Sequence, residues 1–119
     1  MSAPVVIDLQ AIEDLRALNP GDHDEFMHEI IAIFLEDTPE RITELEAAFA
    51  AGDLVKFSRA AHSIKGSSAN LGAAALRLVA GQLEERSRGP DVAGLPPLVA
   101  SLKAEFDRTK AELNRLFPA

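Results

Sequence analysis

The 119-residue sequence contains no cysteine, tryptophan or tyrosine and only six phenylalanines. Without cysteine there are no disulfides, thiolate metal sites or cysteine nucleophiles. A core so poor in aromatic residues must be built from Leu, Ile, Val and Ala, which favours helices over sheets. No stretch approaches the ~18 to 20 apolar residues of a membrane span, and the opening MSAPVVIDLQ does not resemble a signal peptide. We therefore expect a cytoplasmic protein that does not enter a membrane.

Charge is unevenly distributed along the chain, whose formal net charge is −7. An acidic protein is repelled by nucleic-acid phosphates, so no nucleic-acid partner is expected. Residues 56–88, however, contain six basic residues against two acidic ones, a local balance of +4, while the remainder carries −11. This segment is the basic neighbourhood available to an acidic partner.

Helix start and stop signals recur at short intervals. A capping-box pattern, a Thr-Pro helix start and several glycine stops divide the chain into segments of helical length. The signals are Asp22 with Glu25, Thr38 with Pro39, Gly52 followed by Asp53, Gly72, RGPD, and the GLPP that opens a last helix of roughly twenty residues. The Pro/Gly-rich residues 89–97 are interpreted as a loop between helices.

Between these signals, apolar residues recur at helical spacing and no stretch alternates as a strand would. Several amphipathic helices with short connections predict an all-α fold, an antiparallel four-helix bundle with additional N-terminal helices. The length suits a single domain, with residues 1–21 as a cap segment containing a short helix and residues 22–117 as the bundle. The predicted stripes are Phe26, Ile30 and Ile33; Ile42, Leu45 and Phe49; Leu76, Val79 and Leu83; and Leu95, Leu98, Leu102, Phe106, Leu113 and Leu116, with Thr109 filling the gap.

The stretch AAHSIKGSSANLG, residues 60–72, places a histidine on the outer face of a predicted helix. At about 100° per residue, His62 lies about 130° from the centre of the apolar seam, with Lys65 about 70° away on the same side. A glycine inside a helix costs roughly 0.5 to 1 kcal/mol relative to alanine. The glycine at position 66 therefore has three possible explanations: close approach of another molecule, a bend in the helix, or chance. The seam comprises Leu54, Phe57, Ala61, Ile64, Ser68 and Leu71, and the residues beside His62 on the wheel are Ser58, Lys65, Gly66 and Ala69.

The longer stretch AAHSIKGSSANLGAAALRLVAGQLE closely resembles the signature of histidine-containing phosphotransfer (HPt) domains. That signature has Ala-His-x-Leu/Ile-Lys-Gly-Ser-Ser, then Leu-Gly, then Leu-Glu on the next helix. The upstream FLEDTPERITELEAAFAAGD is also similar, so the resemblance covers about residues 22–88. It implies that Nε2 of His62 accepts a phosphoryl group from a receiver-domain aspartyl phosphate or a kinase and passes it to another receiver. It also implies that Lys65 offsets charge on the moving group.

The resemblance brings two positions of the following helix into the site. Glu84 stands where other members often have a glutamine that hydrogen-bonds the histidine ring; a carboxylate there would accept a ring N–H but would also repel phosphate. Arg88 falls where some members carry an arginine near the docking face. The docking surface is therefore expected to comprise Ser58, Gly66, Ser67, Ala69, Glu84 and Arg88.

The implied partners are response-regulator receiver domains and a histidine kinase, which we expect to be a hybrid kinase. The receiver would supply the magnesium, so no cofactor and no metal site are expected in this chain. The sequence lacks the ATP-binding segment of a histidine kinase. We therefore expect a monomeric phosphocarrier of a multistep phosphorelay rather than a self-sufficient enzyme.

Other interpretations fit fewer residues. EFMH, from Glu25 to His28, matches the Glu-x-x-His pair of di-iron bundles, but the required second copy is absent. KGSS lacks the glycine-rich run and preceding strand of a phosphate loop, and no Ser-His-Asp or paired-carboxylate arrangement is suggested by position. The remaining alternative is a helical-bundle adaptor that binds a receiver or other acidic partner without carrying phosphate. Such an adaptor would have no use for His62.

Overall fold

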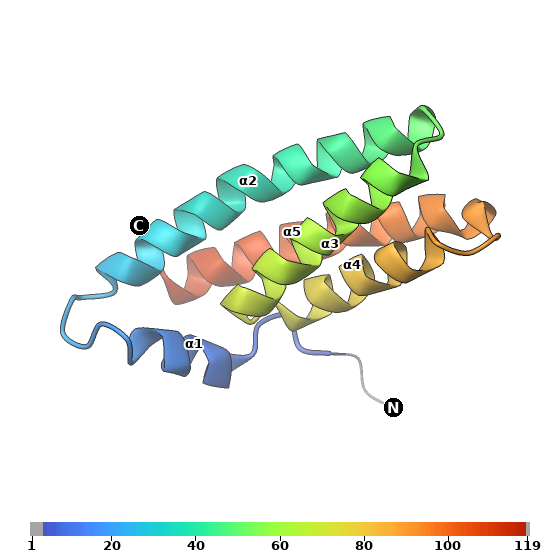
Figure 1. Cartoon of the computed structure of the whole chain (residues 1–119). Helices are drawn as coiled ribbons and strands as arrows, with labels where there is room; N and C mark the ends of the chain where they lie inside the picture. Colours follow the sequence, from blue (N-terminus) through green and yellow to red (C-terminus); the bar gives the residue numbers. More distant parts are fainter. Residues whose placement is uncertain (1–3, 119) are drawn as a thin grey trace.

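The computed structural model describes residues 4–118, and every regular element among them is helical. The helices α2 to α5 lie side by side, and the short helix α1 lies at one end of them (Figure 1). The expectation of an all-α bundle is therefore confirmed. The elements are α1 (Leu9–Arg16), α2 (Glu25–Ala50), α3 (Leu54–Leu71), α4 (Ala74–Arg86), the single 3₁₀ turn η1 (Val92–Gly94) and α5 (Leu95–Leu116).

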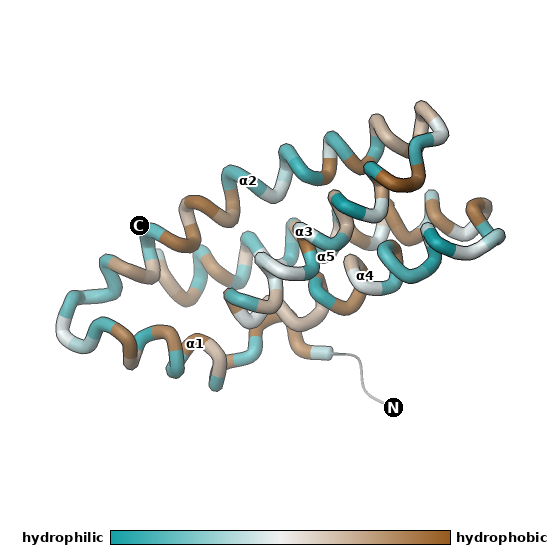
Figure 2. Tube along the Cα trace, in the orientation of Figure 1, coloured by the Kyte–Doolittle hydropathy of each residue, from teal (hydrophilic) through white to brown (hydrophobic). Residues whose placement is uncertain are grey.

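The bundle core is aliphatic, as the composition requires. Hydrophobic and hydrophilic residues alternate along each helix (Figure 2), so that each helix turns one apolar side to its neighbours. Helix α3 packs against both α2 and α4, and α5 packs mainly against α4. The fully buried side chains at the centre of the core include Leu45, Phe57, Ile64, Leu76, Leu83, Leu95, Leu102 and Leu113.

The predicted α3 seam and the predicted helix ends around it are confirmed. All seam residues are buried except Leu54, which is half-buried. The Asp53 carboxylate caps α3 by accepting from the Lys56 amide at 3.1 Å. Gly72 ends the helix in the left-handed conformation, with φ of 74°, and the last helix runs for 22 residues from Leu95.

Helix α1 lies against the junction of α3 and α4, within the segment expected to form a cap; residues 1–3 of that segment lie outside the described residues. The Asp8 amide donates to the Gly72 carbonyl at 2.8 Å, and the Ala75 amide donates to the Val5 carbonyl at 3.1 Å. A Cβ at Gly72 would lie 2.7 Å from the Cβ of Ala11. Gly72 is thus required both by its positive φ and by the closeness of α1.

The predicted helix start at Thr38 and Pro39 is wrong. Helix α2 runs unbroken from Glu25 to Ala50 with Pro39 inside it, and Thr38 is 1% exposed. An interior proline costs about 3 kcal/mol, whereas burying one Leu, Ile or Phe side chain yields about 1.5 to 3 kcal/mol. Because α2 buries several such side chains on both sides of Pro39, packing outweighs the local preference.

The stripe predicted for the first half of α2 is displaced by one residue. The buried side chains are Met27, Ile31 and Phe34, whereas Phe26 and Ile30 are half-buried and Ile33 is 65% exposed. Because α2 is one continuous helix, the side that buries Ile42 and Leu45 in its second half also faces the core in its first half. On that side the first half of α2 places Met27, Ile31 and Phe34, each one residue after the predicted position.

The predicted capping residue before α2 acts two residues earlier than a regular N-cap. The Asp22 carboxylate accepts from the amides of Asp24 and Phe26, both at 3.0 Å. The helix itself begins at Glu25, after Asp24 in a left-handed conformation with φ of 64°. Within residues 4–118, none of the helices combines the length and apolar character needed to cross a membrane.

Candidate functional site

His62 lies in the middle of α3 on the side turned away from the core. Its side chain is 67% exposed, whereas Ala61 and Ile64 beside it in sequence are fully buried. In the structure, as predicted from the helical spacing, the side chain of His62 points away from the core. One ring edge remains accessible to a second molecule.

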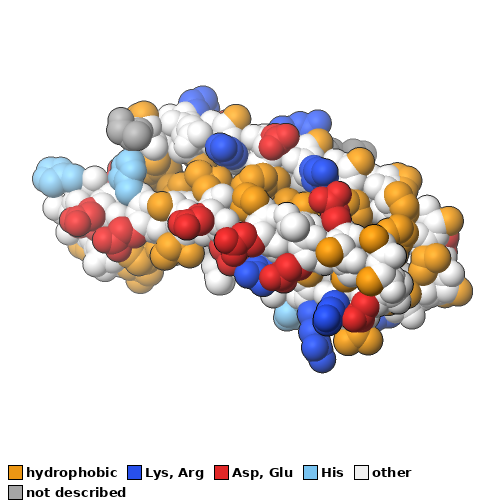
Figure 3. Space-filling view, turned by 90° about the horizontal axis from the view of Figure 1, so that it is seen from above, with side chains coloured by type: hydrophobic (Ala, Val, Ile, Leu, Met, Phe, Trp, Pro, Cys, Tyr) orange, Lys and Arg blue, Asp and Glu red, His pale blue; other side chains and the backbone are white. Residues whose placement is uncertain are grey.

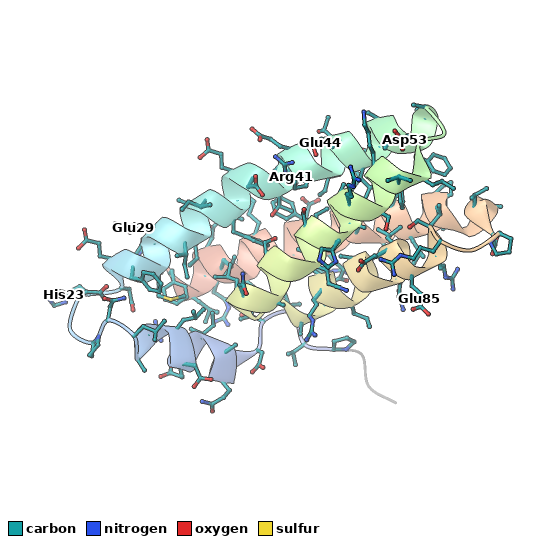
Figure 4. All side chains as sticks on the ribbon, viewed as in Figure 1. His23, Glu29, Arg41, Glu44, Asp53 and Glu85 are labelled. Atoms are coloured by element: carbon teal, nitrogen blue, oxygen red, sulfur yellow. The ribbon has the colours of Figure 1, made fainter. Side chains whose placement is uncertain are left out.

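The other ring edge is held by a carboxylate from the neighbouring helix. Nδ1 of His62 lies 2.8 Å from Oε2 of Glu84 on α4. The Glu84 side chain is only 8% exposed, although it comes from a helix whose next residue, Glu85, projects into solvent (Figure 4). The tight α3–α4 turn at Gly72 brings the two helices together and places Glu84 beneath His62.

Two cations share the same carboxylate. Nζ of Lys65 lies 2.6 Å from Oε1 of Glu84, and a guanidinium nitrogen of Arg88 lies 3.0 Å from Oε2. The hydrogen bond from Lys65 is the largest cause that lowers the pKa of Glu84, burial opposes it, and His62 lowers the pKa further. Glu84 is therefore a carboxylate at neutral pH.

This protonation state determines the histidine tautomer. An ionised carboxylate only accepts hydrogen bonds, so a neutral His62 must donate from Nδ1 at the 2.8 Å contact. The lone pair is then on Nε2, at the free edge of the ring. Such an imidazole is a nucleophile poised for attack on an electrophile brought by another molecule.

The protein surface around His62 is flat because the flanking side chains are small. Gly66 and Ala69 are exposed and Ser58 is half-buried. A Cβ built on Gly66 meets no atom within 4 Å, so no helix contact inside the protein requires a glycine at this position.

Two residues expected on the docking surface lie elsewhere. Glu84 is buried under the histidine instead of facing a partner. Ser67 donates from Oγ to the Ile64 carbonyl at 3.2 Å and lines an apolar cavity of about 300 Å³ between α1, α2 and α3. Ser67 lies five positions after His62, and at about 100° per residue its side chain is turned about 140° away from the histidine on the helix.

Sequence reasoning did not identify the link between Lys65 and Glu84, because it joins residues from different helices. Neither helix taken alone contains a pattern that predicts this contact. A Cβ on Gly81 would lie 3.5 Å from Cδ of Lys65, so the lysine side chain runs over Gly81 on its way to Glu84.

The other histidines are not part of this constellation. His23 projects from the turn before α2 (Figure 4), and the ring of His28 packs edge-on against Phe117 with centroids 6.2 Å apart. Glu25 is exposed at the start of α2. Among the side chains of residues 4–118, no group of three or more His, Asp or Glu is placed to hold a metal ion.

An exposed nucleophilic histidine on a bundle of antiparallel helices defines the class of histidine phosphotransfer domains. Residues 29–112 match the family model of the Hpt domain. The chain therefore belongs to the Hpt domain family.

The similar proteins agree with this assignment. The crystal structure of histidine-containing phosphotransfer protein B from Pseudomonas aeruginosa is 31% identical, superposes with a TM-score of 0.84, and is matched over 96% of this chain and 95% of that chain. Multistep phosphorelay regulator 1 of Schizosaccharomyces pombe is 33% identical over 79 residues, which are 66% of this chain. The matched region spans only 27% of that relative.

Proposed function

We propose that this chain is a phosphocarrier of a multistep phosphorelay in which His62 carries the phosphoryl group. The observation that carries the proposal is a ring 67% exposed whose Nδ1 is bound to a buried carboxylate. This combination leaves Nε2 both accessible and unprotonated. The partners are receiver domains that donate and accept the group, or a histidine kinase, expected to be hybrid, as donor.

In the transfer, the Nε2 lone pair attacks the phosphorus of an aspartyl phosphate. The P–O bond to the aspartate breaks, its electron pair stays on the carboxylate, and an N–P bond forms. Catalysis of this step is largely positioning and electrostatics, and the receiver supplies magnesium. The carrier itself needs no cofactor and no ATP-binding site.

The surroundings of His62 suit such a partner. Ser58, Gly66 and Ala69 present little bulk, and Arg88 is 69% exposed at the edge of the site. Helix α3 carries three basic residues and no acidic one, which favours approach of an acidic receiver active site. We expect the carrier to act as a cytoplasmic monomer.

The test is incubation with a receiver domain labelled by ³²P on its aspartate. We expect the label to move to the chain as an acid-labile, alkali-stable phosphohistidine and then to a second, unlabelled receiver. The matched control is His23→Asn, because asparagine tolerates the left-handed φ of 56° at that position. A chain that binds the receiver but never acquires label would be the non-phosphorylated adaptor instead.

A further inference from the structure

A groove of about 640 Å³ lies between α2 and α3 and extends toward the turn that joins them. On α3 it runs from Ser63, the residue after His62, back to Asp53 at the start of the helix. These two ends are about 15 Å apart along the helix axis. The small side chains that form its apolar floor are Ala47, Ala48, Ala51 and Ala60. The groove therefore begins beside the histidine and leads away from it.

The carboxylates that face this groove already have partners inside the protein. Glu44 accepts from the Arg41 guanidinium at 2.8 Å, and Asp53 accepts from the Lys56 amide at 3.1 Å. Figure 4 shows Arg41 and Glu44 on α2 and Asp53 near the turn between α2 and α3. Arg41 is also 3.4 Å from Asp37, so the charge of this arginine is balanced within α2.

The three cations of α3 differ in how their charge is neutralised. Lys65 binds the buried Glu84 at 2.6 Å, on the side of α3 that faces α4. Lys56 and Arg59 are exposed and line the groove on the side that faces α2. Neither of these two takes part in an ion pair among residues 4–118. Because they are three positions apart, their charges lie one helical turn from each other at the edge of the apolar floor.

Positive charge beside an apolar floor is complementary to a segment that combines carboxylates with apolar side chains. We propose that this groove is a second contact for the receiver partner. It binds an acidic, partly apolar segment that lies outside the receiver's active site, and Lys56 and Arg59 select that segment by charge. This inference rests on the proposed function. It adds a recognition surface on the α2 side of His62, whereas the carboxylate that holds the ring comes from α4.

The groove contributes to binding of the receiver and not to the chemical step. Lys56 precedes His62 by about 9 Å along the helix, and its side chain is turned about 120° away from the histidine. A charge at that place acts on the encounter of the two proteins, because opposite charges steer association and fix the register of a complex. Reversal of this charge should therefore weaken binding and leave the rate of transfer within the bound complex unchanged.

The first measurement is phosphoryl uptake from an aspartate-phosphorylated receiver by the double variant Lys56→Glu/Arg59→Glu. We expect KM for the receiver to rise roughly tenfold at low salt, with kcat within about twofold of the parent. The difference should vanish near 1 M salt, where the screening length is about 3 Å.

The matched control is Arg108→Glu/Lys110→Glu, which makes the same change of charge at exposed positions of α5. Its KM should rise roughly threefold or less, and circular dichroism checks that both variants are folded. An unchanged KM in folded Lys56→Glu/Arg59→Glu, an equal rise in both variants, or a loss confined to kcat would overturn the inference. A parent chain that takes no phosphoryl group contradicts the proposed function instead.

The second measurement identifies what occupies the groove. Because the chain contains no cysteine, Ala47→Cys introduces a single thiol at an exposed position of the groove for a photo-crosslinker. We expect a cross-link to an acidic segment of the receiver outside its active site, and none from Ala111→Cys on α5. Absence of that cross-link, or a cross-link only to the receiver's active-site loops or to a second copy of this chain, contradicts the inference.

Discussion

Helices α2 and α3 are neighbours in one core but carry opposite charge on their outer surfaces. Helix α2 has seven acidic residues and a single arginine, whereas α3 has three basic residues and no acidic one. Looking down on α2, Figure 3 shows acidic side chains following the helix. The histidine site lies on the basic helix of this pair.

The inner faces of the two helices are alike. Leu45 of α2 and Ile64 of α3 are both fully buried aliphatic side chains. The difference between the helices therefore concerns what they present to a partner and not how they stabilise the bundle. Function and stability should be separable by substitutions on the two sides of α3.

The strongest test of this separation is His62→Gln. We expect complete loss of phosphoryl uptake with helical content and Tm nearly unchanged, because the side chain is outside the core. Labelling and thermal unfolding by circular dichroism measure the two quantities. Variants of His23 and His28 should accept label normally, and loss of labelling in either of them would move the acceptor away from α3.

On the other side of α3, Ile64→Ala should destabilise the bundle by about 3 kcal/mol, through lost burial and the cavity left behind. Val55→Ala is the matched control, since Val55 lies on the same helix but is 62% exposed, and its effect should stay within about 0.5 kcal/mol. Urea unfolding provides both values. Equal effects from the two variants would mean that the faces of α3 are not distinct.

Gly66→Gln should change function without harming stability. The side chain would extend from the open surface one turn beyond His62 and obstruct a receiver, so transfer should fall roughly tenfold to a hundredfold, as misplacement of reacting groups does. Tm should stay the same or rise, because glycine is the poorer helix former. Gly66→Ala, with one methyl group, should raise Tm and transfer nearly normally. Undiminished transfer by the Gln variant would remove the docking argument for this glycine.

Helix α3 shows how much the sequence alone could predict. Its seam follows a regular 3-4 spacing, its start has an aspartate cap and its end a glycine, and all three local signals agree with the packing. The outward direction of His62 follows from the same periodicity. Resemblance to HPt domains supplied the chemical role, which no spacing rule provides.

The features that the sequence did not predict depend on contacts between helices. Helical periodicity identifies an apolar side only to within a residue, so the register of the first half of α2 was set by its continuity with Ile42 and Leu45. Burial of Glu84 depends on how closely α4 approaches α3, which no single-helix pattern contains. Ser67 was expected on the docking surface, although its angle on the helix turns it toward α1 and α2.

Pro39 offers the smallest and most local test of the comparison between α2 and α3. It is exposed within α2, lacks an amide hydrogen, and so leaves the Leu35 carbonyl without its helical donor. Pro39→Ala restores that donor. The gain in helix propensity is about 3 kcal/mol, and the greater freedom of the unfolded chain offsets up to about 1 kcal/mol, so the bundle should become about 2 kcal/mol more stable. Because Pro39 is on α2 whereas His62 is on α3, the rate of phosphoryl transfer should not change. A destabilised Pro39→Ala variant would show that α2 requires the bend that a proline imposes, and a slower one would extend the functional surface from α3 onto α2.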